Sequence, residues 1–537
     1  MFNQLVTPVG ESLALSFAVG AIPIVVVLIL LGVIRRPAWQ AAGAGLLVGL
    51  IIAVTVWQLP AAQALSSIAN GATFALIPVM WIVFNALVLY NITVSSGRFD
   101  AFRAWMLEHL PNDRRVVLVV IGFSFGCLLE GISGFGTPVA ITAALLIALG
   151  FPALEAVVFT LIFNTAPVAF GALGTPVTTL GAVTQLSDVT LGAMIGRQLP
   201  FLAFLLPFYA IGLYGGLRAL KGVWPVLAVA GGSFGLAQFL TSNYLSYALT
   251  DVLASLGSLI VTVLFIKVWK MPVEPAYALN APPQAAASHR GRDLAAWSGW
   301  MPWLLLAALV ILWTHLRINL IGQIPVQWPA LHNEVFITTY DRPYAAVWNF
   351  QPLGTGTAIL VTSILVAIIV RLNMGDFVRA FSTAFRQVRL PALTTMLIIG
   401  LAYLMNYSGM TYTLGIGVAS AGFLFPFLSA FLGWLAVFLS GSDTSGNALF
   451  GNLQVVAARE LNLDPVLMAA TNSSGGVLGK MISPQNLTTG TSITGLTGRE
   501  GEVLARTFKH SIILTVLLGL LVMAQQYLFP WMIPPLP

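Results

Sequence analysis

The feature that most constrains this chain is the recurrence of uncharged apolar runs about as long as a bilayer is thick. Residues 12–34 and 72–94, for example, contain no charged side chain. A helix needs roughly 20 apolar residues to cross the hydrocarbon core. Charged residues make up only 8% of the 537 positions, against about 25% in soluble domains. A β-barrel would instead show short alternating segments. The sequence therefore predicts an all-α polytopic membrane protein.

The basic residues predict the orientation of the spans. Arg35 and Arg36 follow the first run, and Arg114 and Arg115 follow the third. Because Lys and Arg concentrate in cytoplasmic loops, we expect both termini outside. No Lys or Arg precedes the first apolar run, so we expect no cleavable signal peptide. The pattern suggests about twelve transmembrane helices plus two re-entrant hairpins. A polar segment at 271–298, rich in Pro and Ala, is predicted to be a cytoplasmic linker between an N-terminal half (1–270) and a C-terminal half (299–537).

Helix-breaking and polar residues interrupt one of the most apolar regions. The stretch 129–138 contains Glu130, two hydroxyl residues, three glycines and a proline, and the residues on both sides of it are uncharged. Irregular backbone at membrane depth persists only where it is buried in protein or lines a wet cavity. An ionisable residue there is by default a functional-site hypothesis. We therefore expect a re-entrant hairpin at 116–150, followed by a helix at 154–191 that is broken after Asn164.

Similar interruptions recur in the second half at almost the same offset. A shift of 310 places Gly131 on Gly441, and a shift of 308 places Asn164 on Asn472. The second hairpin is then 423–458, and the second broken helix is 466–495. In the predicted topology the two hairpins enter from opposite sides. Inverted repeats with discontinuous helices are the architecture of secondary transporters.

The four interruptions are rich in groups that suit a small carboxylate. Helix N-termini offer free N–H donors and partial positive charge, and hydroxyls and amides add further donors. Lys480 is the only lysine between Met271 and Lys509 and lies in the second broken helix, so one cation would face one monoanionic group. The predicted substrate-binding residues are Ser133, Gly134, Thr137, Asn164, Thr165, Thr444, Ser445, Asn472, Ser473, Ser474, Lys480 and Asn486.

Two carboxylates at the hairpin tips, Glu130 and Asp443, are the predicted proton-coupling residues. Burial without a cation raises the pKa of a carboxyl group. Importing an anion against a negative interior costs about 2.3 kcal/mol per 100 mV, and a co-transported proton cancels that charge. Structural roles compete with these: a membrane-helix hydroxyl often bonds its own helix, Glu130 could pair with a nearby Lys or Arg, and Lys480 could pair with Asp443.

At these motifs the chain resembles the bacterial lactate permease family. The matching segments are 130–138, 164–176, 442–447 and 472–486, and the similarity runs the whole length. The resemblance implies proton-coupled symport of L-lactate, D-lactate and glycolate across the bacterial cytoplasmic membrane. It also implies an elevator-type carrier similar to the ion-transporter superfamily.

Other functions stay open at this stage. A sodium-coupled carrier of dicarboxylates is the main alternative, and an intramembrane hydrolase using Ser133 or Ser474, or a channel, would be of a different class. The single cysteine, Cys127, and five histidines near span ends predict no cofactor, no metal site and no catalytic residues. The expected partners are lactate or glycolate, protons and the lipid bilayer, with no nucleic acid. The oligomeric state is left open, with a homodimer as one arrangement.

Overall fold

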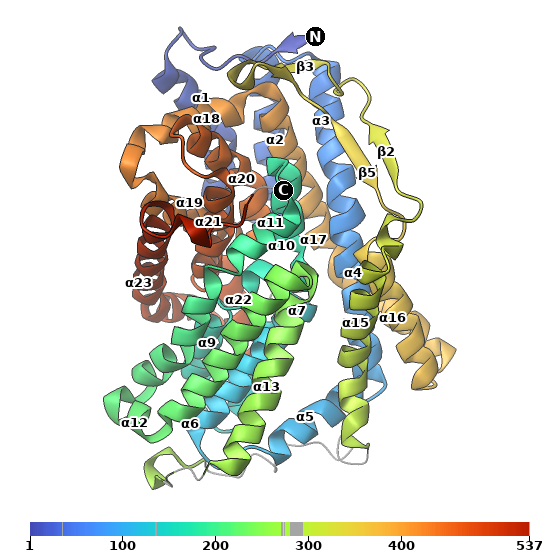
Figure 1. The fold of residues 1–537 in the computed structure, drawn as a ribbon, viewed down its shortest axis with the longest axis vertical. Helices are drawn as coiled ribbons and strands as arrows, with labels where there is room; N and C mark the ends of the chain where they lie inside the picture. Colours follow the sequence, from blue (N-terminus) through green and yellow to red (C-terminus); the bar gives the residue numbers. More distant parts are fainter. Residues whose placement is uncertain (35, 135–136, 270–271, 273, 280–293, 536–537) are drawn as a thin grey trace.

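The computed structural model describes residues 1–34, 36–134, 137–269, 272, 274–279 and 294–535 (Figure 1). Within these ranges ten helices are long and apolar enough to cross a membrane, or eleven if one pair bent by 65° counts as a single span. That pair joins 153–163 to 168–184. The chain is therefore a predominantly helical multi-pass membrane protein, as the sequence predicts. Most of the predicted linker lies outside the described residues.

The first half consists of helices joined by short turns. In order they are α1 (Leu13–Leu28), η1 (Ile29–Val33), α2 (Ala38–Thr55), α3 (Ala61–Phe74), η2 (Ala75–Met80), α4 (Trp81–Ser95), α5 (Arg98–Glu108), α6 (Arg114–Val117), η3 (Leu118–Phe125), α7 (Gly126–Ile132), α8 (Thr137–Ala148), α9 (Ala153–Phe163), η4 (Val168–Phe170), α10 (Gly171–Thr184), α11 (Asp188–Ile195), α12 (Leu199–Tyr244), η5 (Tyr247–Leu249), α13 (Thr250–Val268) and η6 (Pro275–Tyr277). Helix α12 is a helical hairpin: its backbone leaves helical geometry at Gly215 and Gly216, and Gly231 packs back against Phe204.

The second half has the same character. Its helices are α15 (Ala296–His315), η8 (Ile318–Leu320), η9 (Thr338–Tyr340), α16 (Thr355–Ile369), α17 (Met374–Ser408), α18 (Met410–Val418), η10 (Ala419–Leu424), α19 (Phe425–Ser440), α20 (Asp443–Glu460), α21 (Pro465–Lys480), α22 (Pro484–Ile493), α23 (Glu500–Tyr527) and η11 (Pro530–Met532). Helix α17 is continuous through Pro391. The basic amphipathic segment 377–389 and the apolar run 391–406 therefore belong to one helix, because a proline is tolerated in a membrane helix whose neighbours satisfy the backbone.

Two small sheets correct the all-α prediction. Strand β1 (Phe2–Asn3) pairs in parallel with β3 (Val335–Ile337), which pairs antiparallel with β4 (Arg342–Pro343), and β2 (Ile324–Gln327) pairs antiparallel with β5 (Val347–Phe350). Strands of two to four residues are too short to produce a detectable alternating pattern. Figure 1 shows them at the same end of the molecule as the N-terminus, with α5 at the opposite end. In the predicted topology the sheets lie outside.

Glycines allow the helices of the second half to pack closely. A Cβ atom at Gly433 of α19 would overlap the carbonyl oxygen of Asn472 on α21, and Gly475 and Gly479 of α21 meet the backbone of α19 in the same way. Small residues at interfaces let membrane helices approach closely and gain van der Waals contact. This packing fixes α21 beside the α19–α20 hairpin in the middle of the molecule (Figure 1).

Candidate functional site

The four interruptions predicted from the sequence meet around one small cavity. The C-terminal end of α7, the start of α10, the turn between α19 and α20, and the break between α21 and α22 all line it. The lining residues are Glu130, Gly134, Val168, Gly171, Ala172, Thr175, Pro176, Gly441, Ser442, Asp443, Thr444, Lys480 and Gln485. Segments more than 300 residues apart in the chain therefore share one site. Phe135 and Gly136 of the first motif lie outside the described residues.

Local backbone geometry makes three helices begin at this cavity. Ala172, Leu173 and Gly174 have φ of 45°, 56° and 78°, so the regular part of α10 starts only at Thr175 and Pro176. For L-residues other than glycine such a left-handed conformation costs about 1–2 kcal/mol each. The Oγ atom of Ser442 accepts from the Ser445 N–H at 3.3 Å and caps α20. The Oγ of Ser483 caps α22 in the same way, accepting from the Asn486 N–H at 3.4 Å. The partial positive charge of a helix N-terminus is therefore directed at the cavity from three sides.

A buried ion pair connects the two halves across the cavity. The Nζ atom of Lys480 lies 2.5 Å from Oε1 of Glu130, and the Asn164 side-chain amide donates to Oε2 of Glu130 at 3.0 Å. Glu130 is 2% exposed and Lys480 is 6% exposed. The structure decides between pairings that the sequence left open. Glu130 has a cation beside it, and that cation is Lys480, which contacts Glu130 rather than Asp443.

The second tip carboxylate has a different environment. Asp443 accepts hydrogen bonds at Oδ2 from the Ser473 hydroxyl at 2.5 Å and from the Asn447 amide at 3.3 Å. Its Oδ1 atom is buried and has no hydrogen-bond partner among the described residues. The Asn447 amide also donates to the carbonyl oxygen of Pro176 at 3.2 Å, so it links α20 to the start of α10.

The remaining predicted residues either lie at the cavity or make hydrogen bonds elsewhere within the protein. Gly134 and Thr444 line the cavity, and Ser445 contributes the backbone N–H that Ser442 caps. The Ser133 and Thr165 hydroxyls donate to carbonyl oxygens of their own helices, 2.8 Å from Leu129 O and 2.7 Å from Ile162 O. The others hydrogen-bond within the protein: Asn472 to Asn447 and the Gly446 carbonyl, Ser474 to Gln198, and Asn486 to Ser483 and the Lys480 carbonyl. The side chain of Thr137 is outside the described part of the structure.

One residue beside the site escaped the sequence analysis. Asp251, at the start of α13, is 1% exposed, and both of its carboxylate oxygens lack a hydrogen-bond partner within the described ranges. A Cβ atom at Gly131 would lie 2.7 Å from the Asp251 Cβ, so α13 contacts α7 next to Glu130. The signal in the sequence is one carboxylate two residues before the apolar run that begins at Leu253.

The cavity is small in this conformation. Its volume is about 30 Å³, which is room for about two water molecules. A larger cavity of about 580 Å³ lies at the other end of α10, lined by polar residues that include Asn70, Thr178, Asp188 and Tyr247. Residues of α10 line both cavities, so the two cavities lie at opposite ends of this helix. Binding of a small acid in the small cavity requires some separation of the surrounding breaks.

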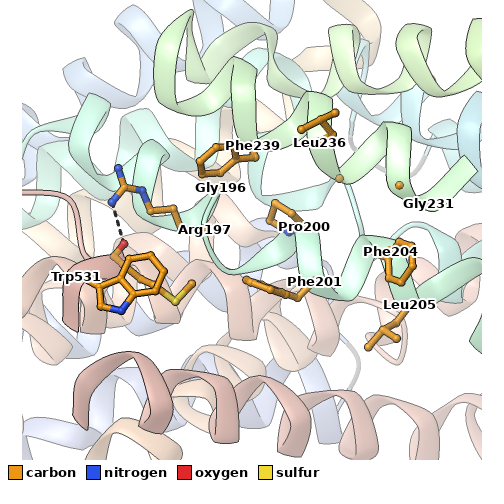
Figure 2. Close-up of a pocket in the computed structure, with 13 residues that line it drawn as sticks. Gly196, Arg197, Pro200, Phe201, Phe204, Leu205, Gly231, Leu236, Phe239 and Trp531 are labelled. Carbon is orange, nitrogen blue, oxygen red and sulfur yellow. Dashed lines mark hydrogen bonds between the residues drawn. The ribbon is translucent and has the colours of Figure 1, made fainter. Parts of the chain in front are cut away.

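A third cavity is of another kind. An apolar groove of about 540 Å³ lies between the two arms of α12 and the C-terminal segment (Figure 2). Phe201, Phe204 and Trp531 line this groove. Arg197 also lines it, and its guanidinium group donates to the Met532 carbonyl at 2.9 Å and to the Asn243 side-chain oxygen at 2.8 Å. The groove is therefore an apolar surface feature with the exposed side chains of Phe201 and Trp531 at its rim, unlike the charged cavity between the helix breaks.

Taken together, the helical spans and the interrupted helices define a multi-pass membrane protein with a small cavity lined by buried charged side chains. Comparison with known proteins gives the family. The family model described as L-lactate permease matches residues 16–529. The chain is 40% identical to the L-lactate permease of Bacillus subtilis (strain 168), over 99% of this chain and 100% of that protein. It is also 40% identical to the glycolate permease GlcA of Escherichia coli (strain K12), over 99% of each chain. The chain therefore belongs to the L-lactate permease family.

Two solved structures show a weaker likeness. The YdaH transporter of Alcanivorax borkumensis aligns with a TM-score of 0.46 at 14% identity, over 88% of this chain and 89% of that one. The MtrF protein of Neisseria gonorrhoeae aligns with a TM-score of 0.49 at 12% identity, over 93% of this chain and 97% of that one.

Proposed function

We propose that this protein is a proton-coupled symporter of L-lactate and related small 2-hydroxymonocarboxylates, including D-lactate and glycolate, in the bacterial cytoplasmic membrane. Family membership supports this, since the similar proteins carry the names L-lactate permease and glycolate permease. The observation that carries the proposal is the Lys480–Glu130 pair between the N-termini of three helices. It provides one cation, one exchangeable carboxylate and several N–H donors in one place.

The substrate carboxylate is proposed to take the place of Glu130 at Lys480. A monocarboxylate bound there would keep the lysine paired and would also face the N-termini of α10, α20 and α22, which stabilise negative charge. Thr444 and Asp443 line the same cavity. The unpartnered Oδ1 of Asp443 would accept a hydrogen bond from the substrate's 2-hydroxyl group, which distinguishes a 2-hydroxy acid from a plain carboxylic acid.

Charge balance in the site is the proposed reason for the coupling to a proton. Lys480 and Glu130 together are neutral, so a bound anion would add one uncompensated negative charge to a cavity that also holds the Asp443 carboxyl group. Such a charge is costly to bury, and one proton on the displaced Glu130 removes it. Substrate and proton would therefore bind together. Glu130 is assigned as the coupled carrier, because only it competes with the substrate for the lysine, and Asp443 serves as a polar ligand.

The architecture predicted from the sequence is retained as part of the proposal. Segments 116–150 and 423–458 would act as re-entrant hairpins of an inverted repeat of about twelve spans, with both halves contributing to a moving transport domain. Contacts between halves support this: Lys480 with Glu130 and Asn447 with the Pro176 carbonyl join the repeats at the cavity. The 580 Å³ cavity at the far end of α10 would be the entrance from the outside.

The decisive experiment is uptake of labelled L-lactate by the purified protein in liposomes, with an imposed pH gradient or an imposed Na⁺ gradient. We expect accumulation driven by an acidic exterior, no requirement for Na⁺, and competition by D-lactate and glycolate. Accumulation that follows the Na⁺ gradient, ignores the pH gradient and is inhibited by dicarboxylates would replace this proposal with the sodium-coupled alternative. Uptake that neither saturates nor shows counterflow would indicate a channel.

A further inference from the structure

Helix α13 has a buried polar face that the proposed binding step does not use. Four polar residues occur at spacings of four, three and four: Asp251, Ser255, Ser258 and Thr262. These spacings place them on one side of a helix, and all four are at most 1% exposed. The stripe extends about 16 Å along the axis at 1.5 Å per residue. It begins beside the site and runs toward the end of the helix that carries the exposed Lys267.

Two contacts show what this stripe faces. Asp251 packs against Gly131 of α7, and the Ser258 hydroxyl lies 2.9 Å from the Ser124 hydroxyl of η3. The contacts are seven residues apart on each helix and run in opposite directions, so α13 is antiparallel to the η3–α7 segment. By the same register Ser255 faces Cys127. The facing segment η3 is π-helical over eight residues, a geometry that occurs mostly in single turns and frequently at functional sites.

Within the described residues the hydroxyls of the stripe do not bond their own helix: Ser258 donates to the Ala230 carbonyl of α12 at 2.9 Å, and the other two have no partner. Ser255 Oγ, Thr262 Oγ1 and both carboxylate oxygens of Asp251 are buried without a hydrogen-bond partner within the described ranges. Hydroxyls of α16 behave in the ordinary way: Thr362 donates to the Ala358 carbonyl at 2.9 Å, and Ser363 donates to the Ile359 carbonyl at 2.9 Å. Buried polar atoms in proteins are almost always satisfied by a protein group or by ordered water.

We infer that the α13 stripe and the facing η3–α7 segment form a hydrated proton path between the site and the cytoplasm. Asp251 lies at the end of this path that is next to the site. This inference rests on the proposed proton symport. Successive stripe residues are three or four positions apart, about 5–6 Å along the helix, and one water molecule can bridge that separation. Ser124 and Ser258 form the direct link in the middle.

The proposed transfer is a sequence of balanced proton movements. Asp251 is buried without a cation and therefore rests in its neutral, protonated form. When the substrate leaves, Lys480 is briefly unpaired, and its charge offsets an Asp251 carboxylate formed by loss of a proton to the water and hydroxyl chain, which releases a proton at the Lys267 end. Glu130 then passes its own proton to Asp251 and returns to Lys480 as a carboxylate, so that one proton has crossed and Asp251 is neutral again. The charged and titratable groups that act on Asp251 are Glu130, Lys480 and Cys127.

The test measures two fluxes in liposomes that hold a pH-sensitive dye: internal acidification after an L-lactate pulse, and lactate counterflow without a pH gradient. In Asp251→Asn we expect acidification to slow by about tenfold or more, equivalent to a barrier higher by about 1.4 kcal/mol, while counterflow stays near the wild-type rate. Asp251→Glu should restore acidification. The double variant Ser255→Ala/Thr262→Val should show the same split with a smaller loss, and it keeps the test valid if Asp251→Asn does not fold.

Thr362→Val is the matched control, because it removes a buried membrane hydroxyl that already bonds its own helix. It should leave both fluxes unchanged. If the wild type counterflows lactate but never acidifies the lumen, proton symport fails and this inference fails with it. If the wild type acidifies and the α13 variants acidify equally fast, only the proton path is overturned. An equal fall of acidification and counterflow in those variants would assign them a structural role and would also overturn it.

Discussion

The two hairpin tips present carboxylates to the same cavity but hold them in different ways. Glu130, in the first half, has a lysine 2.5 Å away and an amide donor. Asp443, in the second half, has one hydroxyl and one amide on a single oxygen and no ion-pair partner within the described residues. Lys480 belongs to the second half but pairs with Glu130 of the first half. Two similar interruptions therefore hold their carboxylates differently, one in an ion pair and one by neutral hydrogen-bond donors. In the proposed mechanism the first carries the proton and the second binds the substrate.

Removing the shared cation should have the largest effect. Lys480→Ala leaves Glu130 buried and unpaired, and breaking a buried pair costs about 3–5 kcal/mol. We expect thermal unfolding at a clearly lower temperature and lactate binding reduced to background. Adding Glu130→Gln should recover most of the stability without recovering binding. Unchanged lactate affinity in Lys480→Ala would remove this lysine from the site.

Neutralising the paired carboxylate should abolish coupling but not exchange. Glu130→Gln keeps an acceptor for Asn164 and removes the group that takes up the proton. We expect pH-driven accumulation to be lost, while counterflow continues and becomes insensitive to pH. Accumulation at the wild-type level in this variant would show that the coupling group is elsewhere, with Asp443 as the next candidate.

The other carboxylate should matter less. Asp443→Asn retains a side-chain oxygen for Ser473 and loses one acceptor in the cavity. We expect lactate affinity to fall by about tenfold, or about 1.4 kcal/mol, with pH-driven accumulation still present. The measurement is the affinity for L-lactate against that for propionate, which lacks the 2-hydroxyl group and should bind equally to both proteins. Loss of coupling in Asp443→Asn with coupling intact in Glu130→Gln would reverse the comparison.

The smallest effect is expected at a hydroxyl that bonds its own helix. Thr165→Val removes the donor to the Ile162 carbonyl three residues earlier, a local bond that we expect to contribute no more than the roughly 0.6 kcal/mol average for hydrogen bonds between membrane helices. Lactate affinity should change by less than about threefold. Ser473→Ala is the matched comparison, because its hydroxyl bonds Asp443 and its loss should approach the effect of Asp443→Asn. A large loss in Thr165→Val would mean that this hydroxyl turns to the substrate.

The sequence predicts where the chain breaks better than it predicts what the breaks contact. Glycine, proline and polar residues in an apolar background are strong local signals, so the positions around Glu130, Ala172, Asp443 and Lys480 could be found, and all four line one cavity. The partner of Lys480 lies 350 residues away in the chain, and two carboxylates were equally plausible. Only the direction in which the lysine side chain extends from α21 decides between them.

Other differences arise where the local signal is weak. Asp251 lies two residues before the apolar run that begins at Leu253, and whether such a residue is buried depends on the neighbouring helix, here on how closely Gly131 lets α13 approach. Helix α17 continues where a proline suggests a stop. The two small sheets form from strands that are distant in sequence, such as Phe2 with Val335. No short apolar pattern in the sequence indicates such pairings.

The bonds that cross the cavity have a mechanical consequence. Lys480 ties α21 to α7, Asn447 ties α20 to α10, and Ser474 ties α21 to Gln198 just before α12. With the site empty, a shift of either half alone would break the buried Lys480–Glu130 pair; with substrate in place of Glu130, the Asn447 and Ser474 hydrogen bonds still join the halves. The parts of the two halves that surround the cavity are thus expected to move as one rigid body. The surface that slides during transport is then expected at the outer boundary of this body rather than at the interface between the repeats.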